Sequence, residues 1–434
     1  MKRFLASAAL MAVSVCGFAQ DVNKLIKQDD VERIIKTLSA DDMEGRGTFT
    51  KGIDKAATFI DGEFKAAGLK PLTGATGFRQ SFSMLKTTPV SAKATINGTE
   101  VPADRLAITA PASFNWASVS GVEVAKVPAG SNFMEKYQLY ARGDKDMLVL
   151  VDTSFAPMFK RLVARAKRGG TAFKAANGAN KGVVFVMGSL DDVTSLNVAY
   201  EVKTEEKPLF NVAGMIPGKS KKGEYVVFSG HYDHLGIQKN GIAGDTIANG
   251  ADDDASGTTA VISLAKYYKK LNNNERTLIF VAFTAEEIGG FGSQYFSKQM
   301  DPDKVVAMFN IEMIGKDSKF GENSAFITGY ERSDFGKILQ SNLEGTAFKF
   351  YPDPYPQQNL FYRSDNATLA ALGVPAHTIS TDQIDSDKLY HTVKDEFSSL
   401  DVKNIVATIR AIALSSRSIV AGKDAPTRIP KLQQ

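Results

Sequence analysis

Apolar and polar positions alternate along the chain in blocks that predict strands and helices in turn. Short, nearly continuous apolar runs, typical of strands buried on both faces of a sheet, occur at residues 224–230, 276–284, 305–311, 324–330 and 375–381. Helical patterns lie between these runs. Because strands and helices follow one another in this way, we expect an α/β fold with a mixed, mostly parallel sheet sandwiched by helices.

Three helices are predicted in more detail. Ser256 is expected to cap a helix over residues 258–271, and Asp54 is expected to begin another. The second helix would place four residues on one apolar face, namely Ala56, Ile60, Phe64 and Ala67. An amphipathic helix over residues 401–420 is expected to pack on the sheet.

Residues 90–205 have a different pattern, with short strand-like pieces and two apolar runs, DMLVLVD and KGVVFVMG, that predict a pair of strands. The basic stretch KRLVARAKRGG lacks interleaved aromatic residues, so a solvated helix face is expected there rather than a nucleic-acid patch. We expect an inserted smaller α/β domain at 90–205 within one larger domain, residues 20–89 and 206–425. Residues 426–434 are expected to be an unstructured tail.

The first residues have the pattern of a secretion signal. Basic Lys2 and Arg3 precede an apolar segment, and small residues Gly17 and Ala19 are spaced as a cleavage site. The apolar run is too short to predict a membrane span. We therefore expect residues 1–19 to direct export to the periplasm or the extracellular space.

Cysteine content and charge exclude several kinds of site and partner. Cys16 is the only cysteine, and Val15 before it is larger than the residue usual before a lipid-attachment site, so a lipid-anchored form is the weaker alternative. A chain cleaved after the signal has no cysteine, which excludes disulfides, thiolate metal ligands and a cysteine nucleophile. The formal net charge of +4 is too small to make nucleic acid the default partner.

Clusters of acidic residues and histidines lie where predicted strands end or a helix begins. They are His231 with Asp233 in HYD, Asp252 to Asp254 in DDDASG, Glu286 and Glu287 in AEE, Glu312 in NIEMIG, and Tyr390 with His391 in YHT. Functional groups in open α/β sheets gather outside the carboxyl ends of the strands, so these clusters can converge. Carboxylates this close cannot all stay ionised without cations, and imidazole with carboxylate ligands suits zinc.

The order of these motifs resembles the two-zinc aminopeptidase family, which also includes glutamate carboxypeptidase, glutaminyl cyclase and the transferrin receptor ectodomain. The resemblance covers residues 41–85, beginning with MEGRGTFT, and residues 205–415. It implies the zinc exopeptidase fold. The segment AANGANKGVVFVMG resembles the protease-associated domain often inserted in this family.

The resemblance implies two zinc ions per chain and peptide substrates. His231 and Glu312 would bind one ion, Glu287 and His391 the other, and Asp253 would bridge the two. The family usually has an aspartate at the position of Glu312, which places the occupancy or identity of that metal in question.

The resemblance also implies catalytic roles. Glu286 would act as general base and then general acid, and Tyr390 would donate its hydroxyl to the developing oxyanion. Asp233 would accept a hydrogen bond from the ring of His231 and so fix its tautomer.

Other positions depart from the family motifs or belong to none. Asn366 in RSDN and Val393 in YHTV replace the family's histidine and proline, and these changes are expected at the pocket wall. His234 matches no motif and is expected to be a loop histidine with ordinary hydrogen bonds. His377, inside a predicted strand, is expected to be a core residue.

The sequence thus predicts an exported metal-dependent aminopeptidase. A carboxypeptidase, with Arg363 holding the substrate carboxylate, and a glutaminyl cyclase remain open on the same fold, as does a non-catalytic binding protein. No G-x-S-x-G or H-E-x-x-H motif is present, so serine hydrolysis and a thermolysin-like mechanism lack support. The oligomeric state is left open.

Overall fold

The computed structural model describes residues 22–141, 143, 145–173, 181–188 and 192–432. The predicted signal segment and most of the stretch AANGANK lie outside the described residues. The chain forms two compact units. Unit 1 consists of the described residues up to Phe82 and from Leu209 onward, and unit 2 is Ser83–Pro208.

Unit 1 contains a mixed sheet whose central strands are parallel. These are β18 (Ala376–Ser380), β15 (Val305–Ile311), β11 (Lys221–His231) and β14 (Arg276–Phe283), in this order. All four coincide with predicted apolar runs, and the bounds of β15 agree with the predicted run at both ends.

Shorter and antiparallel strands complete the sheet. Strand β16 (Ser324–Ile327) is antiparallel to β18 and parallel to β17 (Lys349–Pro352). On the other side, β10 (Leu196–Ile216) pairs antiparallel with β14 and with β1 (Lys70–Pro71). Strand β10 and strand β2 (Arg79–Ile96) extend from unit 1 into unit 2. The hairpin β12 (Gly236–Ile242) and β13 (Asp245–Ala248) is separate.

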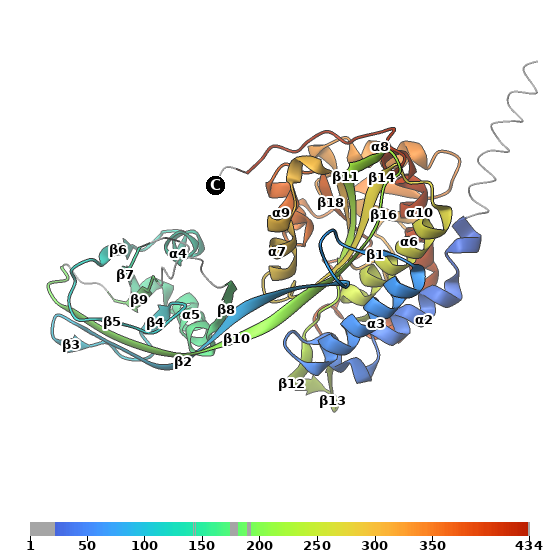
Figure 1. Ribbon diagram of the computed structural model, residues 1–434. Coiled ribbons are helices and arrows are strands. Elements are labelled where there is room, and N and C mark those ends of the chain that lie inside the picture. The colour runs from blue at the N-terminus through green and yellow to red at the C-terminus, as the bar shows by residue number, and fades with distance from the viewer. Residues whose placement is uncertain (1–21, 142, 144, 174–180, 189–191, 433–434) are drawn as a thin grey trace, which may run out of the picture. The chain divides into compact units, whose positions relative to one another are not determined.

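Alternate side chains of each buried strand point to opposite sides, so both faces of the sheet are apolar. Helices cover both of these faces (Figure 1). Val226 and Phe228 of β11 belong to one hydrophobic core, and Val227 belongs to the other. The larger core includes helices α2 (Gln28–Leu38), α3 (Lys51–Ala67), α6 (Gly257–Leu271), α8 (Phe335–Asn342), α10 (Val402–Ser415) and α11 (Arg417–Val420). The smaller core includes α7 (Phe291–Gln299) and α9 (Asn366–Ala371). The predicted fold class is confirmed.

Two predicted helix starts are wrong. Ser256 has helical dihedral angles (φ −64°, ψ −50°), and its hydroxyl donates to the Asp252 carbonyl at 2.7 Å instead of capping α6. Helix α3 begins at Lys51, so Asp54 lies inside its first turn. By contrast, Asp401 caps α10 by accepting hydrogen bonds from two backbone amides. The apolar periodicity therefore predicted where the helices lie, but it did not predict which polar side chain caps the unpaired backbone amides at each helix start.

Unit 2 is a smaller α/β unit with a four-stranded sheet. Its strands are β4 (Leu106–Thr109), β9 (Val183–Met187), β7 (Met147–Val151) and β6 (Glu123–Val127), and the predicted pair β7 and β9 is parallel. Its other elements are β3 (Thr99–Glu100), β5 (Phe114–Trp116), β8 (Gly170–Phe173), α4 (Phe133–Ala141) and α5 (Ala156–Arg168). Helix α5 buries Phe159, Leu162 and Val163, and its basic residues are exposed, as expected for a solvated helix face.

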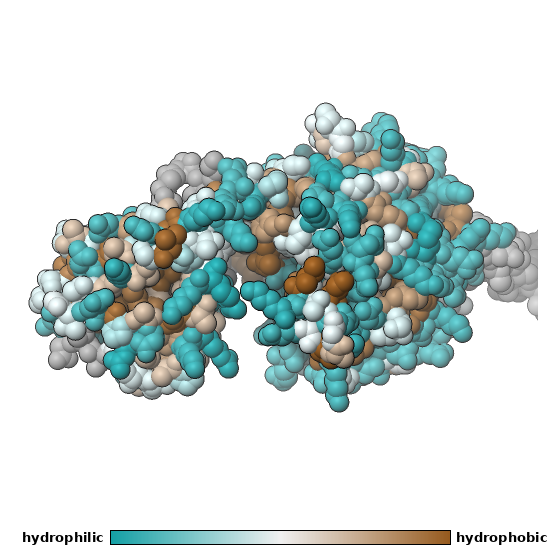
Figure 2. All heavy atoms as spheres, turned by 90° about the horizontal axis from the view of Figure 1, so that it is seen from below, coloured by the Kyte–Doolittle hydropathy of each residue, from teal (hydrophilic) through white to brown (hydrophobic). Residues whose placement is uncertain are grey.

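The surfaces of both units are mostly hydrophilic on the face drawn in Figure 2, with small hydrophobic areas between the polar side chains. Within the described ranges, none of the helices combines the length and apolar character that crossing a membrane requires. Residues 426–432 form no helix or strand, yet they pack on unit 1. Ile429 is buried, and its amide donates to the Gly373 carbonyl at 3.1 Å.

Candidate metal centre

The candidate site residues lie at one edge of the unit 1 sheet. His231 is the last residue of β11, Glu286 and Glu287 lie in the turn after β14, and Glu312 directly follows β15. These three strands are parallel neighbours, so their carboxyl ends meet. The convergence expected from the sequence is therefore present.

Asp253 lies at the centre of this group. One oxygen of its buried carboxylate, Oδ1, is 3.1 Å from Nε2 of His231, and the other, Oδ2, is 3.2 Å from Nε2 of His391. The same nitrogen of His391 is 3.2 Å from Oε2 of Glu287. The carboxylate of Asp253 thus lies between two imidazoles, which is an arrangement suited to a bridging ligand.

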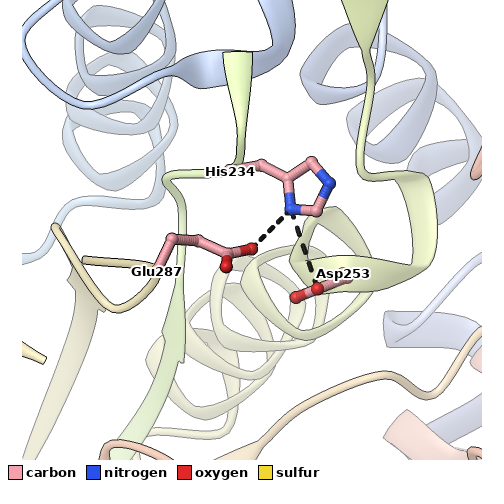
Figure 3. A group of neighbouring side chains, drawn as sticks. All are labelled: His234, Asp253 and Glu287. Carbon is pink, nitrogen blue, oxygen red and sulfur yellow. Dashed lines mark ion pairs between the residues drawn. The ribbon is translucent and has the colours of Figure 1, made fainter. Parts of the chain in front are cut away.

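His234 belongs to the same group, in contrast to the loop histidine with ordinary hydrogen bonds that was expected. Its Nδ1 is 2.7 Å from Oε1 of Glu287 and 3.7 Å from Oδ2 of Asp253 (Figure 3). Nδ1 and Oε1 are not aligned for a hydrogen bond, and both ring nitrogens are buried without a hydrogen-bond partner. The only signal in the sequence was the position of His234 in the same loop as His231.

Asp233 acts through the turn that carries the two glutamates. Its carboxylate accepts hydrogen bonds from the backbone amides of Glu286 (3.0 Å) and Glu287 (3.3 Å) and from the Thr48 hydroxyl (3.2 Å). Nδ1 of His231 lies 3.1 Å from the backbone carbonyl of Asp233 and 3.8 Å from its carboxylate. The predicted ring hydrogen bond therefore goes to the carbonyl, because the carboxylate is turned toward the amides.

The neighbours of Asp253 have structural contacts instead of facing the histidines. Asp254 accepts hydrogen bonds from the amides of His231 (3.0 Å) and Met313 (3.1 Å), and so connects the ends of β11 and β15. Asp252 accepts from the amide of Gly315 at 2.7 Å. Burial raises the pKa of Asp254 well above its usual range and that of Asp252 to about 7.

Arg46 connects two loops of the site, and sequence reasoning did not identify it. It ends the 3₁₀ helix Asp41–Arg46, and its guanidinium is fully buried. The guanidinium donates to the carbonyls of Tyr232 (2.8 Å), Asn249 (2.6 Å) and Gly250 (2.8 Å). Tyr232 lies in the loop after β11, and Asn249 and Gly250 lead into Asp253. The motif MEGRGTFT contained this residue, but only its resemblance to a family segment was recognised.

The electrostatics of the group favour a bound cation. Burial, together with neighbouring carboxylates, raises the pKa of Glu286 well above its usual range and also raises that of Glu312. Burial acts on Asp253 in the same direction, but its contacts with His231 and His391 outweigh it and lower its pKa. Several buried atoms that could bind a metal have no hydrogen-bond partner, namely Nε2 of His231, Nδ1 of His234 and Oε1 of Glu287. Imidazole nitrogens and carboxylate oxygens in this state fit a zinc ion.

A cavity opens beside this group. Asp253, Glu286, Glu312 and Tyr390 line it, and so do Arg363 and the apolar side chains of Met313, Phe326, Leu360 and Ile384. The Tyr390 ring stacks on His391 with 3.8 Å between ring centroids. In the described part of the chain, Glu312 forms no ion pair with a histidine, and Asn310 donates to it at 3.4 Å.

Two positions that depart from the family motifs, Asn366 and Val393, are not among the residues that line the cavity. Asn366 is fully buried, and its amide donates to the carbonyls of Phe361 (2.9 Å) and Ala376 (3.2 Å). Val393 is also buried. Arg363 and Ser364, from the same segment as Asn366, do line the cavity.

The sequence of this part of the chain matches a known family. Residues 211–415 match the model of Peptidase family M28. These residues are a peptidase M28 domain. The match lies wholly within unit 1, begins directly after unit 2, and contains every residue predicted for the site.

Curated relatives of the M28 domain are leucine aminopeptidases. "Leucine aminopeptidase 1" of Ajellomyces capsulatus (strain H88) is 24% identical over 254 residues, which are 54% of this chain and 64% of the relative. The protein of the same name from Pyrenophora tritici-repentis is 27% identical over 237 residues, 51% of this chain and 58% of the relative. The chain thus matches less than two thirds of the length of these relatives.

Solved structures share the fold. The aminopeptidase from Aneurinibacillus sp. strain AM-1 has a TM-score of 0.54 at 17% identity, covering 96% of this chain and 97% of that one. BSAP, a zinc aminopeptidase from Bacillus subtilis, has a TM-score of 0.54 at 15% identity, covering 94% and 99%. These likenesses show that the M28 domain and its flanking segments have an aminopeptidase-type fold.

Proposed function

We propose that this chain is an exported exopeptidase that binds two zinc ions and releases N-terminal residues from peptides. The observation that carries the proposal is the carboxylate of Asp253, which lies between His231 and His391 at the wall of a cavity that Glu286 also lines. The aminopeptidase names of the sequence relatives support it.

Five side chains would hold the ions. His231 and Glu312 would bind one ion, Glu287 and His391 the other, and Asp253 both. Zinc, when bound, supplies a Lewis acid that polarises a carbonyl and lowers the pKa of water. Asp233 would keep the turn with Glu287 in place through its two amide contacts.

Glu286 would move the proton of the reaction. It lies beside the ligand Glu287 but forms no ion pair within the described residues, so its carboxylate is available to accept a proton from water and give it to the leaving amine. Tyr390 keeps its proton, because burial raises its pKa, and would donate to the oxyanion.

The cavity indicates the substrate side chain. Its apolar lining, Met313, Phe326, Leu360 and Ile384, would remove an apolar N-terminal side chain from water. Arg363 at the same cavity favours one other function, a carboxypeptidase, because a guanidinium can bind the terminal carboxylate of a peptide.

Product analysis separates these functions. The zinc-loaded protein is incubated with a leucine-initiated peptide in free, N-acetylated and C-amidated forms, and products are followed by mass spectrometry. We expect stepwise N-terminal loss from the free and amidated forms only. Loss of C-terminal residues that Arg363→Gln abolishes would establish the carboxypeptidase instead, and ammonia loss from N-terminal glutamine would establish a cyclase.

Glu286→Gln is the matched variant for this assay. It should retain the zinc content of the wild type, because Glu286 is no ligand, and its turnover should fall about a hundredfold or more. Unchanged turnover with full zinc content would refute the role of Glu286.

Export and the nature of unit 2 complete the proposal. The basic and apolar pattern of residues 1–19 supports export to the periplasm or outside, with a lipid-anchored form less expected. The α/β composition of unit 2 is compatible with the proposed protease-associated type of domain.

A further inference from the structure

We propose that His234 is an additional metal ligand, which makes four protein ligands for the ion held by Asp253, Glu287 and His391. This inference rests on the proposed metal-dependent function, and it concerns a residue that none of the sequence motifs includes. The proposed ligand atom is Nδ1.

The contacts of His234 are those of a ligand. Nδ1 is 2.7 Å from Oε1 of Glu287 and 3.7 Å from Oδ2 of Asp253. Three ligand atoms, one from each of these residues, lie within 4.8 Å of one another. Figure 3 shows the imidazole and both carboxylates directed toward one point. Although Nδ1 of His234 and Oε1 of Glu287 lie 2.7 Å apart, neither of these two atoms has a hydrogen-bond partner, so the lone pairs of a neutral imidazole and a carboxylate are free to bind a cation between them.

His377 provides the contrast within the same chain. Both histidines are buried, with 1% exposure for His234 and none for His377. Nδ1 of His377 is 2.8 Å from the Thr328 carbonyl and Nε2 is 2.7 Å from the Ser333 hydroxyl, as predicted for a core histidine. His234 has neither ring nitrogen satisfied. Because buried polar groups are nearly always hydrogen-bonded, a histidine without partners requires another explanation.

The backbone holds His234 in this position. Its amide donates to the Arg46 carbonyl at 3.2 Å, and it forms a β-bridge with Gly47. Gly250 lies against the ring, and a side chain there would place Cβ 2.5 Å from the imidazole at a backbone φ of +56°. Only glycine fits at this point, so the loop that leads to Asp253 is shaped around the imidazole.

A fourth protein ligand makes the two metal positions different. Zinc sites with four protein ligands are typical of closed, tightly bound ions, whereas sites with three keep a position open. The position with His234 would then be the closed, high-affinity one. The position with His231, Asp253 and Glu312 would exchange its ion more readily.

Zinc titration and X-ray absorption spectroscopy test this assignment on the full chain. The wild-type protein should bind two zinc ions with different affinities. Its X-ray absorption spectrum should show three imidazole ligands in total for the two ions. His234→Asn should weaken the tighter ion at least tenfold and reduce the count to two imidazoles. His377→Asn is the control, because it also removes a buried histidine but one that contacts Ser333 and Thr328 instead of the proposed ligands. It should change neither the zinc affinity nor the number of bound imidazoles.

The outcomes separate this inference from the proposed function. If His234→Asn keeps the wild-type affinity and three imidazoles remain, His234 is not a ligand and the metal-dependent function still stands. If the wild type binds no divalent metal, both the function and the inference fail. The imidazole count of the wild type needs no variant, so a spectrum that fits only two imidazoles contradicts the inference even if His234→Asn does not fold.

Discussion

At the residue scale, the four histidines differ in what satisfies their ring nitrogens. His377 has two hydrogen bonds inside the core, whereas His231, His234 and His391 face carboxylates. His377 therefore stabilises the fold in its neutral form, whereas the other three histidines are free to bind a metal. The first role should be measurable in the pH dependence of stability and the second in the zinc content.

The pH dependence of stability should contain a contribution from His377. Burial lowers its pKa to about 4, from the ordinary value of 6.5, so between these pH values the unfolded chain binds a proton that the folded chain does not. The contribution is complete above pH 6.5 and is lost progressively as the pH falls toward 4, by about 3 kcal/mol. Denaturant unfolding should show that His377→Gln loses less stability than wild type over this window. An equal loss in both proteins would contradict the assignment.

Asp253→Asn tests the bridging ligand. An amide oxygen binds zinc far less well than a carboxylate shared by two ions, so the variant should lose both zinc ions after dialysis against low zinc. Metal analysis by mass spectrometry measures this directly. Retention of two zinc equivalents would show that Asp253 does not bridge.

At the element scale, the site depends on turns that hold three strand ends together. Asp254 connects β11 with β15, Asp233 connects the loop after β11 with the turn after β14, and Arg46 connects that loop with the segment before Asp253. Arg46 donates only to backbone carbonyls in the contacts described above. A planar guanidinium with five N–H donors can reach several carbonyls at once, which a lysine ammonium cannot.

Arg46→Lys should therefore lower the free energy of unfolding. An ammonium cannot reach all these carbonyls, and each buried carbonyl left unsatisfied costs roughly 1–3 kcal/mol. We also expect weaker zinc binding, because the two loops carry metal ligands. Arg79→Lys is the control, since Arg79 is partly exposed and pairs with Asp54 and Asp61. An Arg46→Lys variant as stable as Arg79→Lys would show that the hydrogen bonds of Arg46 to the two loops do not stabilise the fold.

The sequence was sufficient for the elements and for part of the site. Apolar runs predicted the central strands because these are buried on both faces. The motif order predicted that His231, Asp253 and His391 converge, and these side chains do lie together, while their binding of metal stays a prediction. His234 and Arg46 were missed because their roles depend on chain segments that meet only in the folded protein. The cap predicted at Ser256 is wrong because Ser256 already has helical dihedral angles and its hydroxyl donates to the Asp252 carbonyl.

At the scale of the whole molecule, the site lies within unit 1 alone. All residues proposed to bind metal come from this unit, and unit 2, Ser83–Pro208, has its own hydrophobic cores. The insertion predicted at 90–205 falls inside unit 2, and its type of domain stays a prediction. Metal binding should therefore stabilise unit 1 specifically.

Chelation should reveal this coupling. Removing zinc with a chelator should lower the melting temperature, because a ligand present at a thousand times its Kd stabilises the folded state by roughly 4 kcal/mol. The effect should be much smaller for Glu287→Gln, which lacks a ligand of one ion. Calorimetric scans of both proteins with and without chelator measure it, and equal shifts in the two would argue against zinc binding by Glu287.

The most direct test of the metal centre is a crystal structure of the zinc-loaded protein with anomalous diffraction at the zinc edge. We predict two peaks, one beside His231, Asp253 and Glu312 and the other among Asp253, Glu287, His391 and His234. A single peak, no peak, or a zinc ion held instead by the other acidic group, Asp252, Asp382 and Asp387, would contradict the proposed dimetal site.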